Sequence, residues 1–566
     1  MRTMCMFVVF LNALAVVCCA ANIYVPADYP TIQAAVDAAV NGDTVIVSDG
    51  VYTGEGNRDI DIGPKAITIR SQNGPENCVI DCEGSFQDNH RAFYSMSPGP
   101  GHITIRDFKI QNGNMSGMTE ELYGGAIHSS QAVQFMIQNC IFINNYSTHG
   151  GAIYIGTNSW ASVVSCLFVQ NEAVSGGGIR GEVGSHSEVI DCEFQGNSAL
   201  AGGGICCFPI SSGMTISRCN FIGGSAEFGG GVALTAVDGS FADADLLDKG
   251  QREPGIYFID ECTFVENDAQ NGGAIASYFS NPGISRCLIH LNSAIYNGGG
   301  ILTDCSHAEI KNNLILGNSA GDKGGAVHIR GPHGSTVMEV CTLVENSAET
   351  GGCISLESSQ VSTMTNNILF QNSAPTGNEI ALYNGFTYSE LGVDYSNIPG
   401  GMSDIFVEMG STLIFGYNNL DVDPLFTPGP LGSYYLSNIA AGQTETSLCV
   451  DAGYEISSQS CFNAPTEQNC MDEFTTATDQ VLDTGLVDLG YHYPTVPCEH
   501  DCDPNQDGEI TAGDASMTFQ IALGSIPSTY TERCSADYTQ DGMITAMDAQ
   551  LIFMVALGMC ECGDPV

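Results

Sequence analysis

Cys140-Ile-Phe142-Ile-Asn-Asn145-Tyr-Ser-Thr-His-Gly150-Gly151-Ala-Ile153-Tyr-Ile155 decides the fold, because its pattern returns through the middle of the chain. The repeated core is Gly-Gly-(Ala/Gly/Cys)-(Ile/Val), with an Asn about eight residues upstream. Its aliphatic residue falls at ten positions: Ile127, Ile153, Ile179, Ile205, Val232, Ile275, Ile301, Val327, Ile354 and Ile380. The spacings are 26, 26, 26, 27, 43, 26, 26, 27 and 26 residues. So constant a period indicates stacked units that share one continuous core.

Each repeat has the composition of strands and turns. Short runs of β-branched and aromatic residues are separated by Gly, Asn and Ser, and no ten-residue helix fits between them. Three short strands and three turns fit into one period at about 3.3 Å per strand residue, and each coil then rises about 4.8 Å. The sequence therefore predicts a mainly β fold, a parallel β-helix solenoid, and the general crossover bias favours the right hand.

Stacking turns each repeated residue into a column. The Asn column predicts a ladder of side-chain hydrogen bonds between coils, with Gly224 in the fourth-coil slot. It contains Asn145, Asn171, Asn197, Asn267, Asn292, Asn318, Asn346 and Asn372. We expect the Gly pairs where a Cβ would clash or φ must be positive. A Phe column, which we expect to stack inside the solenoid, contains Phe142, Phe168, Phe194, Phe221 and Phe264.

A cysteine column stands two residues before these phenylalanines, with Asn313 and Asn367 in two of its slots. It contains Cys140, Cys166, Cys192, Cys219, Cys262, Cys287 and Cys341. Alternation along a strand puts Cys and Phe on one face, which predicts buried, unpaired thiols. Disulfides between neighbouring coils are the alternative. A metal array is disfavoured because no His joins the column at ligand spacing.

The composition limits the partners. The net charge is −48, from 16 Lys+Arg against 64 Asp+Glu. Such a chain should repel nucleic acid and anionic membranes. The negative charge also argues against a polyanionic glycan as ligand, unless calcium bridges the glycan and the protein. The acidity can also serve solubility alone.

Residues 1–20 have the pattern of a signal peptide, with Arg2, an apolar run and small residues before a cut after Ala20 or Ala21. Cys18 leaves a lipoprotein alternative. No later segment reaches the 18 apolar residues of a membrane span. We therefore expect a secreted or cell-surface protein. Export makes disulfides plausible, and the candidates outside the column are Cys449, Cys461, Cys470, Cys498, Cys502, Cys534, Cys560 and Cys562.

The N-terminal segment carries a family resemblance. Residues 30–40 predict a small amphipathic helix with Ile32, Ala35, Val36, Ala39 and Val40 on one face, well placed to cover the end of the stack. The stretch 29–45 resembles the opening of secreted pectate-lyase-like right-handed β-helix proteins. The Phe-x-x-Asn and Gly-Gly-Ala-Ile motifs are similar to repeats of chlamydial polymorphic membrane proteins. These resemblances imply a β-helix over 21–385 with an N-terminal capping helix.

The period fades after Ile380. The segments 418–426, 449–453 and 483–494 resemble the closing part of exported bacterial β-helix proteins. We interpret 386–494 as terminal coils and a C-terminal cap, in which His492 is a packed residue.

Two acidic loops near the C-terminus predict calcium sites. Oxygen ligands at loop positions 1, 3, 5 and 12, a backbone carbonyl at 7 and Gly at 6 surround Ca²⁺. The first loop supplies Asp503, Asn505, Asp507, Glu509 and Asp514. The second supplies Asp537, Thr539, Asp541, Met543 and Asp548. Each loop precedes a helix, and the pair resembles a type I dockerin over 498–566, with Asp at position 12. Positions 10 and 11, where cellulosomal dockerins contact cohesin, are Ala512, Gly513, Ala546 and Met547, so a cohesin-like or other cell-surface partner stays open.

No known catalytic motif is present. The chain has no Asp-Asp pair, Gly-His-Gly, Arg-Ile-Lys or Trp-x-Asp-His, and the sequence places no acidic partner beside Arg180, Arg218, Arg286 or Arg330. The insert 236–255 is a possible ligand loop through Asp238, Asp243, Asp245, Asp248, Lys249 and Arg252. The first hypothesis is an exported protein that binds or processes extracellular glycan. The alternative is a non-catalytic adhesin or structural protein; a polysaccharide lyase or glycoside hydrolase is a third.

Overall fold

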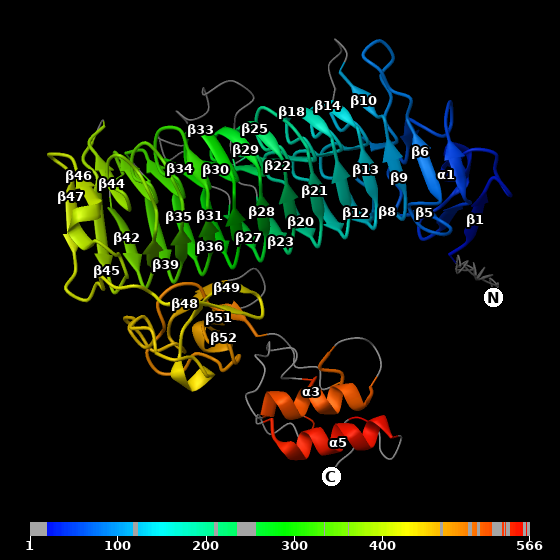
Figure 1. Cartoon of the computed structure of the whole chain (residues 1–566). Helices are drawn as coiled ribbons and strands as arrows, with labels where there is room; N and C mark the ends of the chain where they lie inside the picture. Colours follow the sequence, from blue (N-terminus) through cyan, green and yellow to red (C-terminus); the bar gives the residue numbers. More distant parts are fainter. Residues whose placement is uncertain are drawn as a thin grey trace, which may run out of the picture.

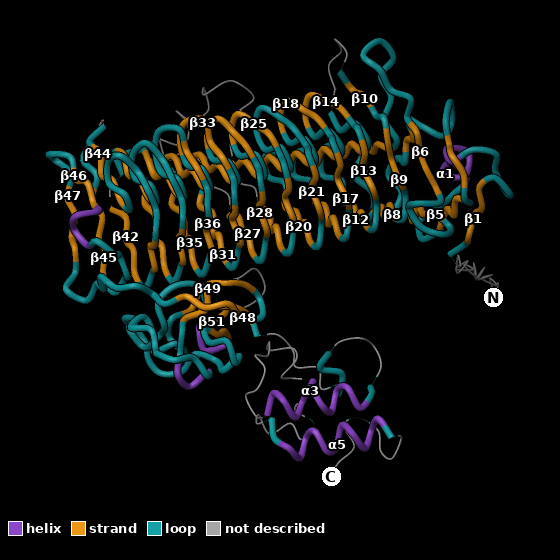
Figure 2. The backbone as a smooth tube through the Cα atoms, in the orientation of Figure 1, coloured by secondary structure: helices purple, strands orange, loops and turns teal. Residues whose placement is uncertain are grey.

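The fold is seen in a computed structural model of the chain (Figure 1). It describes residues 20–116, 123–208, 213–234, 256–332, 334–359, 361–385, 387–463, 468–495, 501–505, 510–522, 535–536, 538, 544–557 and 562. A long solenoid of parallel strands dominates the molecule, and Figure 2 shows its strands repeating from coil to coil. The predicted mainly β, parallel β-helix fold is confirmed.

Three long parallel sheets form the walls of the solenoid in the described residues. The 15-stranded sheet contains β1 (Asn22–Val25), β2 (Thr44–Val47), β5 (Thr68–Ser71), β8 (Ile103–Arg106), β12 (Gln134–Gln138), β16 (Trp160–Val164), β20 (His186–Ile190), β23 (Gly213–Ser217), β27 (Ile256–Asp260), β31 (Asn281–Ser285), β35 (His307–Lys311), β39 (Ser335–Glu339), β42 (Val361–Thr365), β45 (Glu390–Asp394) and β47 (Thr412–Phe415). The 13-stranded sheet contains β4 (Ile60–Asp61), β7 (Phe93–Ser95), β11 (Ile127–Ser129), β15 (Ile153–Ile155), β19 (Ile179–Gly181), β22 (Ile205–Cys207), β26 (Val232–Leu234), β30 (Ile275–Tyr278), β34 (Ile301–Asp304), β38 (Val327–Arg330), β41 (Ile354–Glu357), β44 (Ile380–Tyr383) and β46 (Ile405–Val407). The 12-stranded sheet contains β3 (Gly50–Tyr52), β6 (Cys78–Asp81), β9 (Lys109–Gln111), β13 (Ile141–Ile143), β17 (Leu167–Val169), β21 (Glu193–Gln195), β24 (Asn220–Ile222), β28 (Thr263–Val265), β32 (Leu288–His290), β36 (Leu314–Leu316), β40 (Thr342–Val344) and β43 (Ile368–Phe370).

Two short parallel sheets add a fourth side to part of each coil. They contain β10 (Asn114–Met115), β14 (Tyr146–His149) and β18 (Glu172–Ser175), and β25 (Ser225–Phe228), β29 (Asp268–Asn271), β33 (Ser293–Asn297) and β37 (Ser319–Ala320). The repeat residues are in register, since Ile127, Ile153 and Ile179 are successive partners on neighbouring strands.

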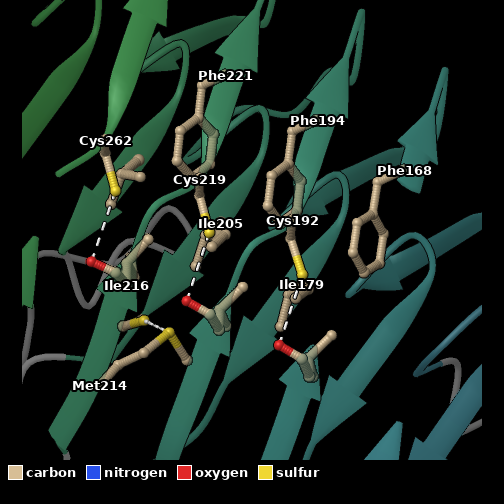
Figure 3. Packing of buried hydrophobic residues seen from close by; sticks show 14 of the residues in the cluster. Phe168, Ile179, Cys192, Phe194, Ile205, Met214, Ile216, Cys219, Phe221 and Cys262 are labelled. Atoms are coloured by element: carbon tan, nitrogen blue, oxygen red, sulfur yellow. Dashed lines mark hydrogen bonds between the residues drawn. The ribbon is translucent and has the colours of Figure 1, made fainter. Parts of the chain in front are cut away.

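The predicted interior columns are present (Figure 3). The five Phe rings stack with centroids 4.6 to 4.9 Å apart and planes within 14°. The seven column cysteines are buried free thiols, each bonded to a main-chain carbonyl, as Cys262 is to Ile216 at 3.5 Å. These thiols are therefore buried and hydrogen-bonded to the main chain, and they do not form disulfides.

The Asn ladder is also confirmed, with one difference. Asn318 Oδ1 accepts the N–H and the Nδ2 of Asn292, each at 2.9 Å, and the pattern repeats along the column. The ladder ends where Asn372 Nδ2 donates to the buried carboxyl of Glu379 at 2.7 Å. The left-handed residue of this turn is the one before the ladder Asn, such as Asn144 at φ 53°. The Asn side chain therefore contributes hydrogen bonds and not left-handed backbone.

Each Gly pair serves both expected purposes. The first glycine is left-handed, as Gly150 is at φ 65°. A Cβ on the second, Gly151, would lie 2.2 Å from the carbonyl oxygen of Gly177 in the next coil. The coils can therefore approach this closely only without side chains at that corner.

The N-terminal end is closed by α1 (Ile32–Ala38), which begins at Thr31 through a side-chain cap on Ala34. Ile32, Ala35 and Val36 are fully buried, but Val40 lies beyond the helix and is half exposed, unlike the predicted apolar face.

The segment after β47 packs along the side of the solenoid, below it in Figure 1. It contains the hairpins β48 (Phe426–Gly429) with β49 (Gly432–Leu436) and β50 (Cys461–Asn463) with β51 (Gln468–Cys470), the pair β52 (Phe474–Thr475) and β53 (Tyr493–Pro494), and the 3-10 turns η3 (Ile439–Ala441) and η4 (Met471–Glu473). A further turn, η2 (Gly401–Asp404), lies in the last coil. Tyr435 and Tyr493 contact Leu314 and Val344 on the 12-stranded sheet. The sequence suggested a cap here, whereas β46 and β47 remain the last strands of their sheets.

His492 is fully buried at this contact, as expected. Its Nε2 lies 2.9 Å from Asp483, and its N–H donates to Asn312 of the solenoid at 2.7 Å. Nearby Asp488 is also buried, and burial followed by Asp483 raises its pKa to about 6. The main chain of His492 thus joins the lateral segment to the stack through Asn312, while Asp483 and Asp488 bond within that segment.

Two helices, α3 (Ala512–Ala522) and α5 (Ala546–Ala556), pack together near the C-terminus around Ala515, Leu551 and Ile552. Cys502 and Cys562 form a disulfide there, and Cys461 pairs with Cys470 in the lateral segment. Cys449, another disulfide candidate, is instead a buried free thiol; Cys498, Cys534 and Cys560 lie outside the described residues. Among the helices described, none is long and apolar enough to cross a bilayer.

Candidate functional site

The outer face of the 13-stranded sheet carries most of the unusual chemistry. We call outer-face column the middle residues of its strands, whose neighbours on both sides point into the core: His128, Tyr154, Arg180, Cys206, Ala233, Ala276, Leu302, His328, Ser355 and Ala381. Beside it runs a flank column, the residue before the first glycine of each repeat: Tyr123, His149, Ser175, Ala201, Phe228, Asn271, Asn297, Lys323, Thr350 and Thr376.

The N-terminal half of this surface is closed. Tyr123 stacks on Tyr154 with ring centroids 4.6 Å apart. Arg180 is buried and donates to Ser175 Oγ at 2.6 Å and to Glu182 at 3.0 Å. Burial, followed by the charge of Arg91, lowers the pKa of His128 to about 3. These side chains are satisfied by one another and hold the coils together.

The C-terminal half presents a group of polar side chains that we call the Arg330 cluster. It contains the charged residues Asp304, Lys323, Arg330 and Glu357 and the buried residues Tyr278 and His328. Arg330 Nε and Nη2 lie 2.8 and 2.6 Å from Asp304 Oδ2. Lys323 Nζ lies 2.7 Å from Glu357 Oε2 and 5.4 Å from the centre of the Tyr383 ring. The side chains of Arg330, Glu357 and Lys323 are 40%, 32% and 22% exposed. Solvent and ligands can therefore reach all three.

Two buried polar groups lie beneath these charges. Neither ring nitrogen of His328 nor the hydroxyl of Tyr278 has a hydrogen-bond partner of regular geometry. Burial, followed by Arg330 and Lys323, lowers the pKa of His328 well below its ordinary value, although the main chain of Ser355 opposes this. Burial raises the pKa of Tyr278. At neutral pH the site thus has a neutral imidazole and a neutral phenol under a charged rim.

The strand register fixes the spacing of the two carboxylates. Asp304, Arg330 and Glu357 are successive partners on β34, β38 and β41, so the carboxylates stand about 10 Å apart at the backbone with the guanidinium between them. Both Arg330 nitrogens approach the same oxygen of Asp304, and Lys323 approaches one oxygen of Glu357. Each carboxylate keeps a second oxygen that can accept a hydroxyl.

The arginines named from the sequence prove to be paired, contrary to the expectation of no adjacent acid. Arg180 pairs with Glu182, Arg218 with Asp191, Arg286 with Asp260 and Arg330 with Asp304. Glu182 lies two residues after Arg180, and the other three partners lie 26 or 27 residues earlier, on the preceding coil. The repeat period therefore contained this relation. The insert residues Asp238, Asp243, Asp245, Asp248, Lys249 and Arg252 lie outside the described residues.

Some of the predicted calcium ligands can be placed. Asp503 and Asp514 are buried, and Asp514 Oδ2 accepts the N–H and hydroxyl of Thr511 at 2.8 and 3.1 Å. Its other oxygen, Oδ1, is buried without a partner, as suits a cation ligand. In the second loop Asp548 makes the same contacts with Thr545.

The rest of the ligand set is not placed. Asn505 is described, whereas Asp507, Glu509, Asp537, Thr539, Asp541 and Met543 lie outside the described residues. Within the described ones no group of three or more His, Cys, Asp or Glu is arranged to hold a metal.

Three family models match parts of the chain. They are a right-handed β-helix region over residues 230–394, a dockerin type I domain over 502–553, and a Chlamydia polymorphic membrane protein repeat over 139–156. The first model agrees with the parallel β-helix of the structure, and the second places a dockerin type I match in the C-terminal part of the chain. Type I dockerin domains generally bind calcium and cohesin partners. Dockerin domains and polymorphic membrane protein repeats are typical of extracellular or surface proteins.

Several solved structures are similar to this chain at low identity. They include the catalytic domain of a GH87 α-1,3-glucanase (12% identity, TM-score 0.39, 70% of this chain and 68% of that one). Another is the alginate lyase AlyF-OU02 (12%, 0.38, 82% and 93%). A third is the A-module of the Azotobacter vinelandii mannuronan C-5 epimerase AlgE6 (12%, 0.31, 69% and 94%). No curated protein matches the chain in sequence.

Proposed function

We propose that the protein is an exported, modular β-helix protein that binds extracellular polysaccharide through the Arg330 cluster, with a calcium-dependent dockerin-like tail for assembly. The observation that supports this most is the set of ion-paired, solvent-accessible side chains, Lys323, Arg330 and Glu357, grouped on one face of the solenoid. The carboxylate oxygens and the N–H groups of these side chains can hydrogen-bond the hydroxyls of a sugar.

The ring of Tyr383 beside Lys323 adds an apolar surface of the kind that sugar-binding sites combine with a few placed polar groups. Repetition supports a polymeric ligand, because Asp304, Arg330 and Glu357 are in register on three neighbouring coils. One sugar unit is about as long as one coil rise of about 4.8 Å. The charged residues of three successive strands would therefore face successive units.

For the tail, we propose that the first loop holds Ca²⁺ through Asp503, Asn505, Asp507, the carbonyl of Glu509 and Asp514. The second would use Asp537, Thr539, Asp541, the carbonyl of Met543 and Asp548. The bound ion would neutralise carboxylates that repel one another and so let each loop fold. A cohesin-like or cell-surface protein is the proposed partner, and the protein is secreted or displayed at the surface after removal of residues 1–20, of which 1–19 lie outside the described residues.

The test is binding of the full-length chain to a panel of extracellular polysaccharides in affinity electrophoresis. We expect at least one to retard the protein, and Lys323→Ala with Arg330→Ala to weaken that binding about tenfold or more. The matched control is Lys109→Ala with Arg218→Ala, which removes ion-paired cations from other faces. No retardation by any glycan, or equal loss in both double variants, would contradict the proposal.

The same samples separate binding from catalysis. New reducing ends or unsaturated products would show a hydrolase or lyase. Binding without either product would favour the non-catalytic adhesin.

A further inference from the structure

The pairing of Lys and Arg side chains with carboxylates limits the class of glycan that the Arg330 cluster can bind. Of the 16 Lys and Arg residues, twelve lie in the described part of the chain. Nine of these have a carboxylate within 4 Å: Arg58, Arg106, Lys109, Arg180, Arg218, Arg286, Lys311, Lys323 and Arg330. Lys65, Arg70 and Arg91 donate to main-chain carbonyls.

The Arg330 cluster is electrically balanced for the same reason. Arg330 is paired with Asp304 and Lys323 with Glu357, so two cations face two carboxylates. A uronate would meet a guanidinium whose charge Asp304 already compensates through contacts of 2.6 and 2.8 Å. It would do so in the field of a chain with a net charge of −48.

From this balance we infer that the glycan is neutral and not a polyuronate. The inference rests on the proposed function and narrows its substrate class. The remaining hydrogen-bonding groups fit neutral sugars: Asp304 Oδ1 and Glu357 Oε1 can accept hydroxyls, while the ammonium and guanidinium keep N–H groups that can donate. Charge-assisted bonds to hydroxyls give strong, directional contacts without a charge on the ligand.

One substitution turns this into a specificity test. Asp304→Asn keeps the shape of the side chain but leaves Arg330 without its counter-charge. The matched control is Asp191→Asn, which does the same to Arg218 on another face, where Arg218 Nε lies 2.7 Å from Asp191. The three proteins are compared on soluble neutral glucans, xylan and mannan, and on alginate and polygalacturonate, with calcium present throughout.

We expect the wild-type protein to bind one or more neutral glycans and neither polyuronate. Asp304→Asn should gain polyuronate binding by about tenfold, because one cation becomes free in the site, whereas Asp191→Asn should change it less than about twofold. Wild-type binding to a polyuronate, or equal gains in both variants, would overturn the inference and leave the proposed function standing. Binding to no glycan of either kind would instead overturn the proposed function, and the inference with it.

Discussion

Replacing Asn318 by Ala should lower the stability of the solenoid far more than replacing an exposed Asn by Ala. The side chain of Asn318 is fully buried and makes four hydrogen bonds. Its Oδ1 accepts the main-chain N–H and the Nδ2 of Asn292, both at 2.9 Å, and its Nδ2 donates to Ile289 at 2.8 Å and Asn346 at 3.0 Å. Asn292 Nδ2 keeps other acceptors, in Phe264 and His290, but the N–H of Asn292 loses its partner.

The magnitude follows from these contacts. An orphaned buried N–H costs about 1–3 kcal/mol, and three other lost bonds cost about 1 kcal/mol each. We therefore expect Asn318→Ala to lower the free energy of unfolding by about 4–6 kcal/mol in urea titration. Hydrogen exchange should speed up first at the N–H of Asn292. The control Asn220→Ala removes an exposed Asn and should cost less than about 0.5 kcal/mol. A loss for Asn318→Ala no larger than that of the control would refute the ladder argument.

Three further outcomes are expected. Burial raises the pKa of Glu379 to about 7, above its unfolded value, so its contribution to stability is present at low pH and lost as pH rises through 7. Glu379→Gln should abolish this dependence, on the order of 3 kcal/mol between pH 5 and 8 in urea unfolding, and an unchanged profile would contradict it. The buried column thiols, such as Cys341, whose pKa burial raises to about 12, should react only after unfolding in thiol titration; disulfides in non-reducing peptide maps would count against this. Asp507→Ala and Asp541→Ala should each weaken calcium binding in their own loop by calorimetry, the first more strongly; a 498–566 module that stays folded in excess chelator would argue against a calcium-dependent tail.

The solenoid could be predicted from the sequence because its residues repeat at a constant interval. A constant interval places Phe142 beside Phe168 and Asn145 beside Asn171 whatever the path between them. The same logic identified the buried cysteines and the glycine corners. The dockerin was found through ligand spacing within single loops, which is local information.

The candidate site was missed although it is periodic too, since Asp304 and Arg330 are 26 residues apart. His328, Arg330 and Glu357 are ordinary residues in their own repeats, and they become a cluster only when β38 and β41 lie side by side. One signal was available: reading the residue after each repeat's aliphatic position as a column reveals His128, Tyr154, Arg180 and His328. The lateral position of the segment that contains His492 left no comparable signal, because its contacts join residues 180 apart in the chain.

The central claim is that glycan binds over the Arg330 cluster, and acetylation of lysines tests it most directly. Among the described residues Lys323 and Lys109 have similar side-chain exposures, 22% and 25%, and each is paired with a glutamate. Their acetylation rates can therefore be compared by mass spectrometry in the presence and absence of a glycan that binds. Bound glycan should slow the acetylation of Lys323 several-fold and leave that of Lys109 unchanged. Protection of Lys109 instead, or of neither lysine while the glycan is bound, would contradict it.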